Sequence, residues 1–455
     1  MNTTTNLLRQ RRFLPLFVTQ LFNAFNDNFY KNAMVLFVVY SIYSSESAEG
    51  TFSAVASGLF ILPFFLLSAL AGQLADMRDK AKIIRIVKFC EIGLMIIGAA
   101  GLYLAWRGFD WPFVVPLGFY TIETTVPIAL LLLALFMTGI QSTFLGPIKY
   151  AILPQHLREE EVLAGTGLVE AGTYVAILGG TILGGLIPVE WAAGGIIVTA
   201  IIGYFVSRQV PPAPPQGKVE KLDWHLIRAS VKLVKNTMHD REVYYAILAI
   251  SFFWTIGAVL FIQFPPLAKN TIMASKEVAM LFLVVFSVGV AIGSISINAL
   301  LKGAVSARYA PQSVLAMAAC VVAFYIVSKL WEADKPEILL GVTGFIGWPL
   351  ATVLLLCLFG IAFFGGMFVV PLYAFLTTRA KPDQAARVIA ANNIVNAGAM
   401  VIGSLIAMGL SLAGIAIAEQ LLLSAAMCLI SAWLGRRLYR AECEAAKAGF
   451  PAPEM

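Results

Sequence analysis

The chain has 455 residues, of which 59% are hydrophobic and only 13% are charged, and its mean hydropathy is +0.83. An average soluble chain is about a quarter charged, so this composition excludes a soluble enzyme and a nucleic-acid-binding module, despite the net charge of +6. It indicates an all-α polytopic membrane protein, because roughly 20 apolar residues cross a bilayer and the chain is long enough for twelve crossings.

Apolar runs of spanning length occur in two sets of six along the chain. The first set is at 13–43, 51–75, 82–106, 126–153, 162–187 and 191–208, and the second is at 242–268, 278–301, 309–330, 346–376, 388–414 and 416–436. The first run begins at Phe13 and is too long for the apolar core of a signal peptide, so we expect it to stay as a helix. These runs predict a six-helix half (1–210), a cytoplasmic linker (211–240), a second six-helix half (241–437) and a cytoplasmic tail (438–455).

Basic residues outside the predicted helices gather on one side of the membrane. An even number of crossings puts both termini on the same side. On that side fall 25 of the 32 Lys and Arg, with residues near helix ends, such as Lys88, counted among them, against 5 on the other side. The excess of basic residues in cytoplasmic loops then places both termini in the cytoplasm.

The linker begins with a proline-rich stretch, PPAPP at 211–215, and continues with a predicted amphipathic helix from Asp223. Its apolar residues recur at helical spacing beside an arc of basic residues: Trp224, Ile227, Val231, Val234 and Met238, then Arg228, Lys232 and Lys235. Such a helix is expected to lie on the anionic cytoplasmic leaflet. A solvated tether is the alternative.

Two segments of the first half are echoed in the second. LVEAG at 168–172 matches IVNAG at 394–398, and PIKYAIL at 147–153 matches PLYAFL at 371–376. Because the matches keep their order, they indicate duplication. Two six-helix repeats in the same orientation are typical of the major facilitator fold, whose sites lie near the midplane between the halves.

Charged residues inside the predicted helices occur in the first half alone. An ionised side chain at mid-bilayer costs about 2.5–3.5 kcal/mol, so each needs a partner or a hydrated cavity. The candidate substrate-binding residues are Asn23, Asp27, Lys31, Glu91, Lys149 and Glu170, with the uncharged Asn396 from the second half. The alternative is that Asp27 pairs with Lys31, and Glu170 with Lys149, only to hold helices together.

This asymmetry predicts an amphiphilic substrate. A charged wall suits a polar head group, and an apolar wall opposite suits a hydrocarbon chain. Hydrophobic cations and drugs fit nearly as well, so an exporter of such compounds is the alternative function.

The segment 72–80, GQLADMRDK, follows the second predicted helix and resembles a cytoplasmic loop motif of the major facilitator superfamily. In that motif the aspartate stabilises one closed state through the end of a neighbouring helix. By resemblance, Gly72, Asp76 and Arg78 are candidate gating residues, although Asp79 and Lys80 replace the motif's second glycine and its arginine. An ordinary charged turn that only sets orientation is the alternative.

Several segments together resemble the bacterial lysophospholipid transporter (flippase) family of that superfamily. They are QLFNAFNDN at 20–28, GPIKYAIL at 146–153, LVEA at 168–171, GGMFVVPL at 365–372 and AANN at 390–393. The resemblance implies transport of lysophospholipid, chiefly the ethanolamine form, across the inner membrane to the cytoplasmic leaflet. It places Asp27, Lys149 and Glu170 in the polar site, whereas Glu91 stands where the family usually has a basic residue.

The resemblance also implies that a separate lysophospholipid acyltransferase or acyl-acyl carrier protein synthetase reacylates the product, since only about twenty residues follow the last helix. We expect a monomer that needs no cofactor. The five cysteines occur singly, so we expect neither a disulfide framework nor a metal site. A membrane-embedded acyltransferase is disfavoured, because His156, His225 and His239 all lie outside the helices and lack the His-x-x-x-x-Asp spacing. Proton-coupled transport and uncoupled flipping both stay open.

Overall fold

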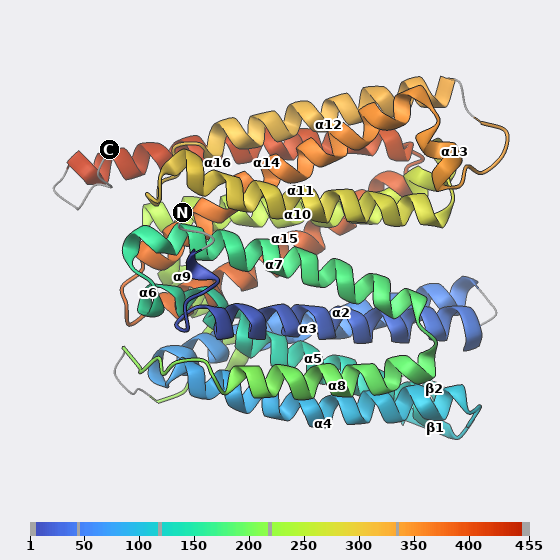
Figure 1. The fold of residues 1–455 in the computed structure, drawn as a ribbon, viewed down its shortest axis with the longest axis horizontal. Helices are drawn as coiled ribbons and strands as arrows, with labels where there is room; N and C mark the ends of the chain where they lie inside the picture. The colour runs from blue at the N-terminus through green and yellow to red at the C-terminus, as the bar shows by residue number, and fades with distance from the viewer. Residues whose placement is uncertain (1–5, 43–45, 117–120, 217–220, 334–335, 448–455) are drawn as a thin grey trace.

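The computed structural model describes residues 6–42, 46–116, 121–216, 221–333 and 336–447, in which long helices dominate (Figure 1). Every predicted apolar run is a helix, which confirms the predicted fold class. The long helices are α2 (Leu14–Phe37), α3 (Glu46–Met77), α4 (Lys80–Trp106), α5 (Val126–Ala151), α7 (Glu159–Leu186), α8 (Val189–Ser207), α10 (Arg241–Pro266), α11 (Lys276–Leu301), α12 (Ala310–Ala333), α14 (Pro349–Arg379), α15 (Ala385–Leu412) and α16 (Ile417–Lys447). The short ones are α6 (Leu153–His156), α9 (Leu226–Thr237) and α13 (Val342–Ile346), with π-helical turns at Val38–Ile42 and Leu267–Thr271.

Ten of the helices in the described ranges are long and apolar enough to cross a membrane. The other two long helices, α2 and α4, have 24 and 27 residues and carry the polar residues that lower their mean hydropathy. At 1.5 Å per residue they are about 36 and 40 Å long, which also suffices to span a bilayer. Both lie within the bundle, α2 against α7 and α8, and α4 against α5 and α8.

The long helices pack as two groups. The first helix group is α2, α3, α4, α5, α7 and α8, and the second is α10, α11, α12, α14, α15 and α16. They meet mainly where α7 packs on α11 and where α15 packs on α3 and α5. The division of the chain into 1–210 and 241–437 as repeated halves stays a prediction.

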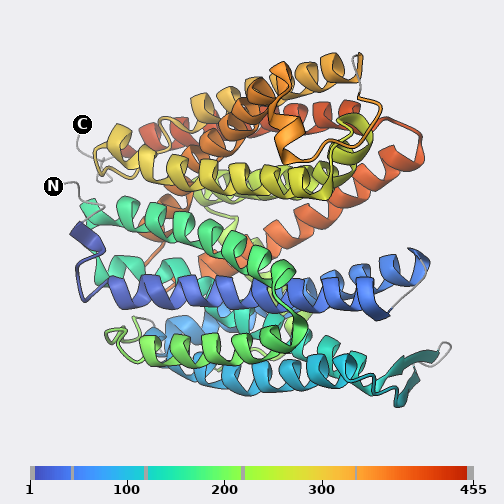
Figure 2. The same cartoon turned by 45° about the vertical axis from the view of Figure 1, so that its right-hand side comes forward.

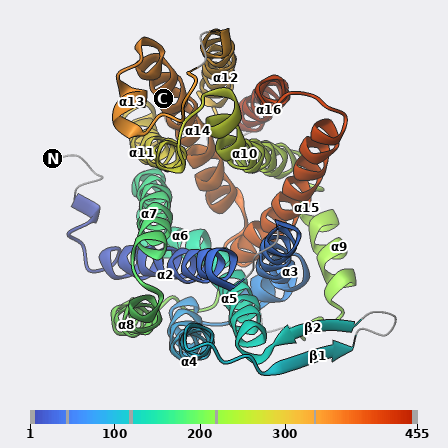
Figure 3. The same ribbon diagram turned by 90° about the vertical axis from the view of Figure 1, so that its right-hand side faces the viewer.

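The two ends of the bundle differ. We call the end where α2 begins and α16 ends, and where α6 lies, the basic end (Figure 1). The opposite end carries a hairpin, in which β1 (Pro112–Pro116) pairs antiparallel with β2 (Thr121–Thr125). Figure 2 shows the two helix groups meeting near the basic end and diverging toward the hairpin end, and Figure 3 shows them from the hairpin end.

The structure differs from the expected fold in two places. The hairpin was not predicted, although valine and threonine favour strands in its segments. Helix α16 continues to Lys447, so residues 438–447 of the predicted tail are helical, in agreement with the good helix formers Ala, Glu and Lys there. Residues 448–455 lie outside the described ranges.

The start of the linker is bound to the first helix group. The backbone N–H of Ala213 donates to Asp79 Oδ1 (3.1 Å), and the N–H of Lys80 donates to the Ala213 carbonyl (3.0 Å). The Pro212 carbonyl lies 3.3 Å from the His156 ring nitrogen Nε2. Burial lowers the pKa of His156, so the ring is neutral at pH 7 and its Nε2–H can donate to that carbonyl. The proline-rich stretch is therefore part of the bundle.

Candidate functional site

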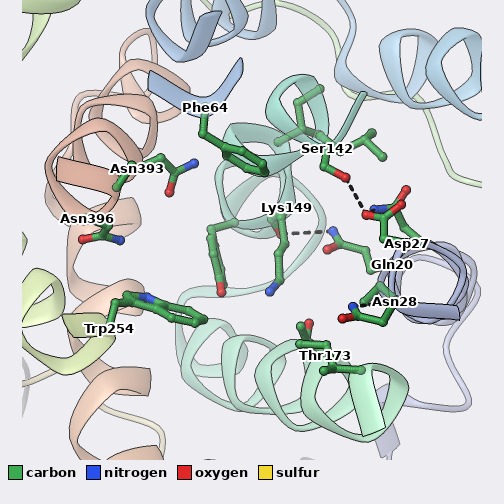
Figure 4. Close-up of a pocket in the computed structure, with 18 of the residues that line it drawn as sticks. Gln20, Asp27, Asn28, Phe64, Ser142, Lys149, Thr173, Trp254, Asn393 and Asn396 are labelled. Carbon is green, nitrogen blue, oxygen red and sulfur yellow. Dashed lines mark hydrogen bonds between the residues drawn. The ribbon is translucent and has the colours of Figure 1, made fainter. Parts of the chain in front are cut away.

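A cavity of about 390 Å³ lies between the two helix groups (Figure 4). Its charged lining residues are Asp27 and Lys149, both from the first helix group. The wall from the second group is uncharged, as predicted, but it is not purely apolar. It includes Trp254, Asn393 and Asn396, which Figure 4 shows on the side opposite Asp27.

Asp27 lies midway along α2, about 20 Å from its start at 1.5 Å per residue. Its Oδ2 accepts hydrogen bonds from the Ser142 hydroxyl (2.5 Å) and the Asn23 amide (3.2 Å). Its Oδ1 is buried and accepts no hydrogen bond from the described residues. Asp27 therefore lines the cavity and has one acceptor oxygen without a partner among the described residues.

Glu91 lies behind Asp27 rather than on the cavity wall. Its carboxylate accepts from the amides of Asn26 and Gln141, each at 2.8 Å, and the Gln141 amide also donates to Asn23 (3.1 Å). Asn23 in turn donates to Asp27, so these hydrogen bonds join Glu91 to the cavity. Glu91 is thus placed to support the site, not to touch a substrate.

Lys88 forms an ion pair with Glu91, and both side chains are completely buried. Sequence analysis counted Lys88 among the loop residues that set orientation, which was wrong, because it lies two turns inside α4. The separation of three residues from Glu91 on one helix was the available signal, since residues three or four apart share a helix face. Lys88 therefore places a basic group one helical turn from Glu91, which stands where the resembled family usually has a basic residue.

Lys149 and Glu170 form the predicted pair, with Nζ 3.2 Å from Oε1. Glu170 is completely buried, whereas Lys149 lines the cavity with its Nζ 4.8 Å from the centre of the Tyr150 ring. The pair therefore joins α5 to α7 and also presents a lysine to the cavity. Of the other candidates, Asn23 and Asn396 line the cavity, and Asn396 accepts from the Ser251 hydroxyl (2.7 Å).

Lys31 is not brought to the cavity. Its ammonium lies 5.7 Å from the centre of the Phe60 ring, in a cation–π arrangement. The described residues contain no ion pair between Lys31 and Asp27, because Asp27 is engaged by Asn23 and Ser142. The expected i,i+4 pair on α2 is therefore absent.

Aromatic pairs join the helix groups beside the cavity. Tyr150 stacks on Tyr373 with ring centroids 4.3 Å apart, and Tyr174 stacks on Trp254 at 6.4 Å. The Trp254 indole N–H donates to the Tyr373 hydroxyl (2.7 Å). Tyr150 and Tyr373 lie near the ends of α5 and α14 at the basic end, so their stack lies on the basic-end side of the cavity. Sequence analysis missed this contact, although the two tyrosines belong to the echoed segments.

Asp76 joins the helix groups at the basic end. Its carboxylate accepts from the backbone N–H groups of Ala386 (3.0 Å) and Arg387 (3.1 Å), which are the second and third residues of α15. A carboxylate at a helix N-terminus satisfies unpaired N–H groups and interacts favourably with the helix dipole. One turn earlier, a Cβ added to Gly72 would lie 2.7 Å from Ala390 Cβ, so glycine is required for this close approach.

The third gating candidate, Arg78, is exposed at the end of α3. The buried basic residue near Asp76 is instead Lys80, which is completely inaccessible to solvent. The reason is that Asp79 caps α4 and turns the chain, so that Lys80 points inward and Arg78 outward. The gating role of Gly72 and Asp76 stays a prediction.

Asp76→Asn is expected to open the basic end. The amide keeps one acceptor oxygen for two backbone N–H groups, and leaving one buried donor unsatisfied costs about 1–3 kcal/mol, which changes the closed-to-open ratio by about 5- to 150-fold. The measurement is thiol labelling of Ile394→Cys, a buried α15 position, in a chain whose five native cysteines are replaced by serine. Asp79→Asn is the matched control, since Asp79 caps α4 and contacts the linker within the first helix group. Equal labelling of the two variants would contradict a gate at Asp76.

Comparison with known proteins agrees with this geometry. Residues 16–404 match the family model described as Major Facilitator Superfamily. The chain is 24% identical over 412 residues to the "Lysophospholipid transporter LplT" of Salmonella heidelberg (strain SL476), and 23% identical to that of Salmonella typhimurium (strain LT2), each match covering 88% of both chains.

Solved structures resemble the fold at low sequence identity. A bacterial homologue of the iron transporter ferroportin in an outward-facing state superposes with a TM-score of 0.68 at 13% identity, covering 97% of this chain and 100% of that one. The human organic anion transporter MFSD10 (TETRAN) gives a TM-score of 0.64 at 14% identity, covering 94% and 98%. This is a multi-pass inner-membrane protein with a cavity between two helix groups, and the family model matches most of its length. The chain therefore belongs to the major facilitator superfamily of secondary transporters.

Proposed function

We propose that this protein carries lysophospholipids with a zwitterionic head group, of the lysophosphatidylethanolamine type, across the inner membrane to the cytoplasmic leaflet. The observation that carries the proposal is the cavity itself, which has Asp27 and Lys149 on one wall and no charged residue on the other. The names of the relatives, lysophospholipid transporters, support it.

The charges of the first wall suit both parts of such a head group. Asp27 offers an unpaired carboxylate oxygen to an ammonium, which forms strong charge-assisted hydrogen bonds. Lys149 offers its ammonium to a phosphate. The Gln20 amide, which donates to the backbone carbonyl of Lys149 (3.3 Å), also lines the cavity. The single acyl chain would then lie against apolar lining residues such as Met400 and Phe64.

A hydrophobic cation is the second candidate substrate, and one observation favours it. Lys149 and Lys88 are each paired with a glutamate, so Asp27 is the one charged lining residue without an ion-pair partner among the described residues. A cation would neutralise it without needing a partner for a phosphate. An exporter of hydrophobic cations therefore has to be tested beside the lysophospholipid transporter.

Transport would proceed by alternating access. The Asp76 contact and the aromatic pairs hold the helix groups together at the basic end, and we infer from the bias of basic residues that this end faces the cytoplasm. A substrate would then enter from the opposite side and leave after these contacts separate. The cavity is formed within one chain, so we expect the monomer to suffice, with a separate acyltransferase consuming the product.

The test is uptake by the purified protein in liposomes, with labelled lysophosphatidylethanolamine and a labelled hydrophobic cation supplied in parallel. We expect uptake of the lysolipid above that of protein-free liposomes. Transport of the cation alone would replace the first proposal with the second. Collapse of uptake on dissipating a proton gradient would indicate coupling.

A further inference from the structure

Helix α9 presents two different faces at the basic end. Ala229 and Ser230 are buried against α3 and α15, in a small cluster with Ala69 and Ile394. On the outer side, Ile227 and Val231 are 66% and 64% exposed, and Trp224, two residues before the helix begins, is 69% exposed. Such a row of large apolar side chains is unusual in water and marks an interaction surface.

Three cations lie beside this apolar row. Arg228, Lys232 and Lys235 are all exposed, and α9 contains no acidic residue. Across the described ranges, no carboxylate lies within ion-pair distance of any of the three. The face therefore carries three positive charges that no carboxylate of the described residues balances.

A groove between α9 and α3 holds these charges and an apolar floor. It is lined by Leu66 from α3 and by Ile227, Val231 and the three cations from α9. Beyond Leu66, the outer surface of α3 continues with Leu62 and Phe65, which are 43% and 44% exposed on a membrane-spanning helix. A cationic rim that leads into lipid-facing apolar surface matches a phospholipid, with its phosphate at the rim and a chain along α3.

The orientation of α9 points to the membrane rather than to a soluble partner. Figure 3 views the spanning helices nearly end-on and shows α9 lengthwise, so α9 lies across the bundle axis, as helices at a membrane interface do. The helix also contacts both α3 and α15, which Asp76 and Gly72 bring together.

We propose that the groove between α9 and α3 binds an anionic phospholipid of the adjacent leaflet, and that this lipid stabilises the conformation closed at the basic end. Occupancy holds α9 against α3 and α15 together, so a lipid that binds this arrangement more tightly shifts the equilibrium toward it. The site is separate from the transport cavity and does not depend on the identity of the transported substrate.

Native mass spectrometry of the full chain tests the binding. Phosphatidylglycerol adducts are compared between the native protein and the triple variant Arg228→Gln, Lys232→Gln, Lys235→Gln, with Arg436→Gln, Arg437→Gln, Arg440→Gln on α16 as the charge-matched control. A basic residue near an anionic surface contributes roughly a fivefold preference, so we expect about 100-fold weaker binding in the α9 variant and none of this loss in the control. Equal weakening of both variants, equal binding of phosphatidylcholine, or displacement of the lipid by inorganic phosphate would overturn the site.

Thiol labelling in lipid nanodiscs tests the coupling to the gate. Phosphatidylglycerol is expected to slow labelling of Ile394→Cys in the native background and to leave the rate unchanged in the α9 triple variant, whose melting temperature in detergent should stay native. The same slowing in both proteins would overturn the coupling. Neither experiment measures transport, so their failure is distinguishable from failure of the proposed function.

Discussion

Asp27→Asn is expected to lower lysophosphatidylethanolamine uptake in liposomes by roughly 10- to 100-fold at equal protein content. The amide keeps the size of the side chain but loses the negative charge that would hold the substrate ammonium, and hydrogen bonds to charged groups contribute about 1.5–3 kcal/mol. The Oδ1 atom, which has no protein donor among the described residues, is the atom whose charge matters most. Initial uptake rates over a range of substrate concentrations measure the effect.

Two comparisons separate this role of Asp27 from a structural one. Lysophosphatidylglycerol lacks the ammonium, so its uptake should fall much less in Asp27→Asn. Ser142→Ala removes the 2.5 Å hydrogen bond to Asp27 but keeps the carboxylate, so its effect on lysophosphatidylethanolamine should also be smaller. If both lysolipids lose uptake equally in Asp27→Asn, the carboxylate supports the fold or couples an ion and does not bind the head group.

Lys88→Met is expected to destabilise the protein by about 3–5 kcal/mol, the usual result of removing one partner from a buried ion pair. The substitution leaves the Glu91 carboxylate charged and completely buried, with only the amides of Asn26 and Gln141 to compensate it. Unfolding in SDS and the apparent melting temperature in mild detergent measure the loss. Lys82→Met, on the exposed side of the same helix, is the matched control.

The double variant Lys88→Met, Glu91→Gln makes this prediction specific to the pair. Removing both charges abolishes the unpaired carboxylate, so the double variant should be more stable than Lys88→Met alone. A Lys88→Met protein as stable as Lys82→Met would show that the buried ion pair contributes nothing to stability.

The helices and the polarity of the cavity walls were predictable because both depend on local sequence. Apolar runs of spanning length located every long helix, including α2 and α4 with their polar residues. Of the candidate residues on α2, Asn23 and Asp27 line the cavity, whereas Lys31 does not. The restriction of charge to the first half correctly predicted an uncharged wall opposite, although Asn393, Asn396 and Trp254 make that wall more polar than expected.

The partner of each charged residue was less predictable. Spacing on α2 suggested Lys31 for Asp27, yet Ser142 of α5 is nearer, and Lys31 lies over Phe60 of α3. Spacing correctly paired Lys149 with Glu170 because their helices are neighbours in sequence. Lys88 was missed because it was counted with the basic residues near the start of the predicted helix. Its side chain in fact lies two turns inside α4, which begins at Lys80.

Composition and periodicity thus established a multi-pass membrane protein, the positions of its long helices and the helix group that supplies the charged residues of the cavity, since each of these follows from the free energy of moving a segment into lipid. Tertiary structure decided which charged groups face the cavity and which charged groups form ion pairs away from it. It also decided which residues close the basic end. Those outcomes depend on the depth and rotation of each helix against its neighbours. Asp76 and Ala386, or Tyr150 and Tyr373, meet only because whole helices pack side by side.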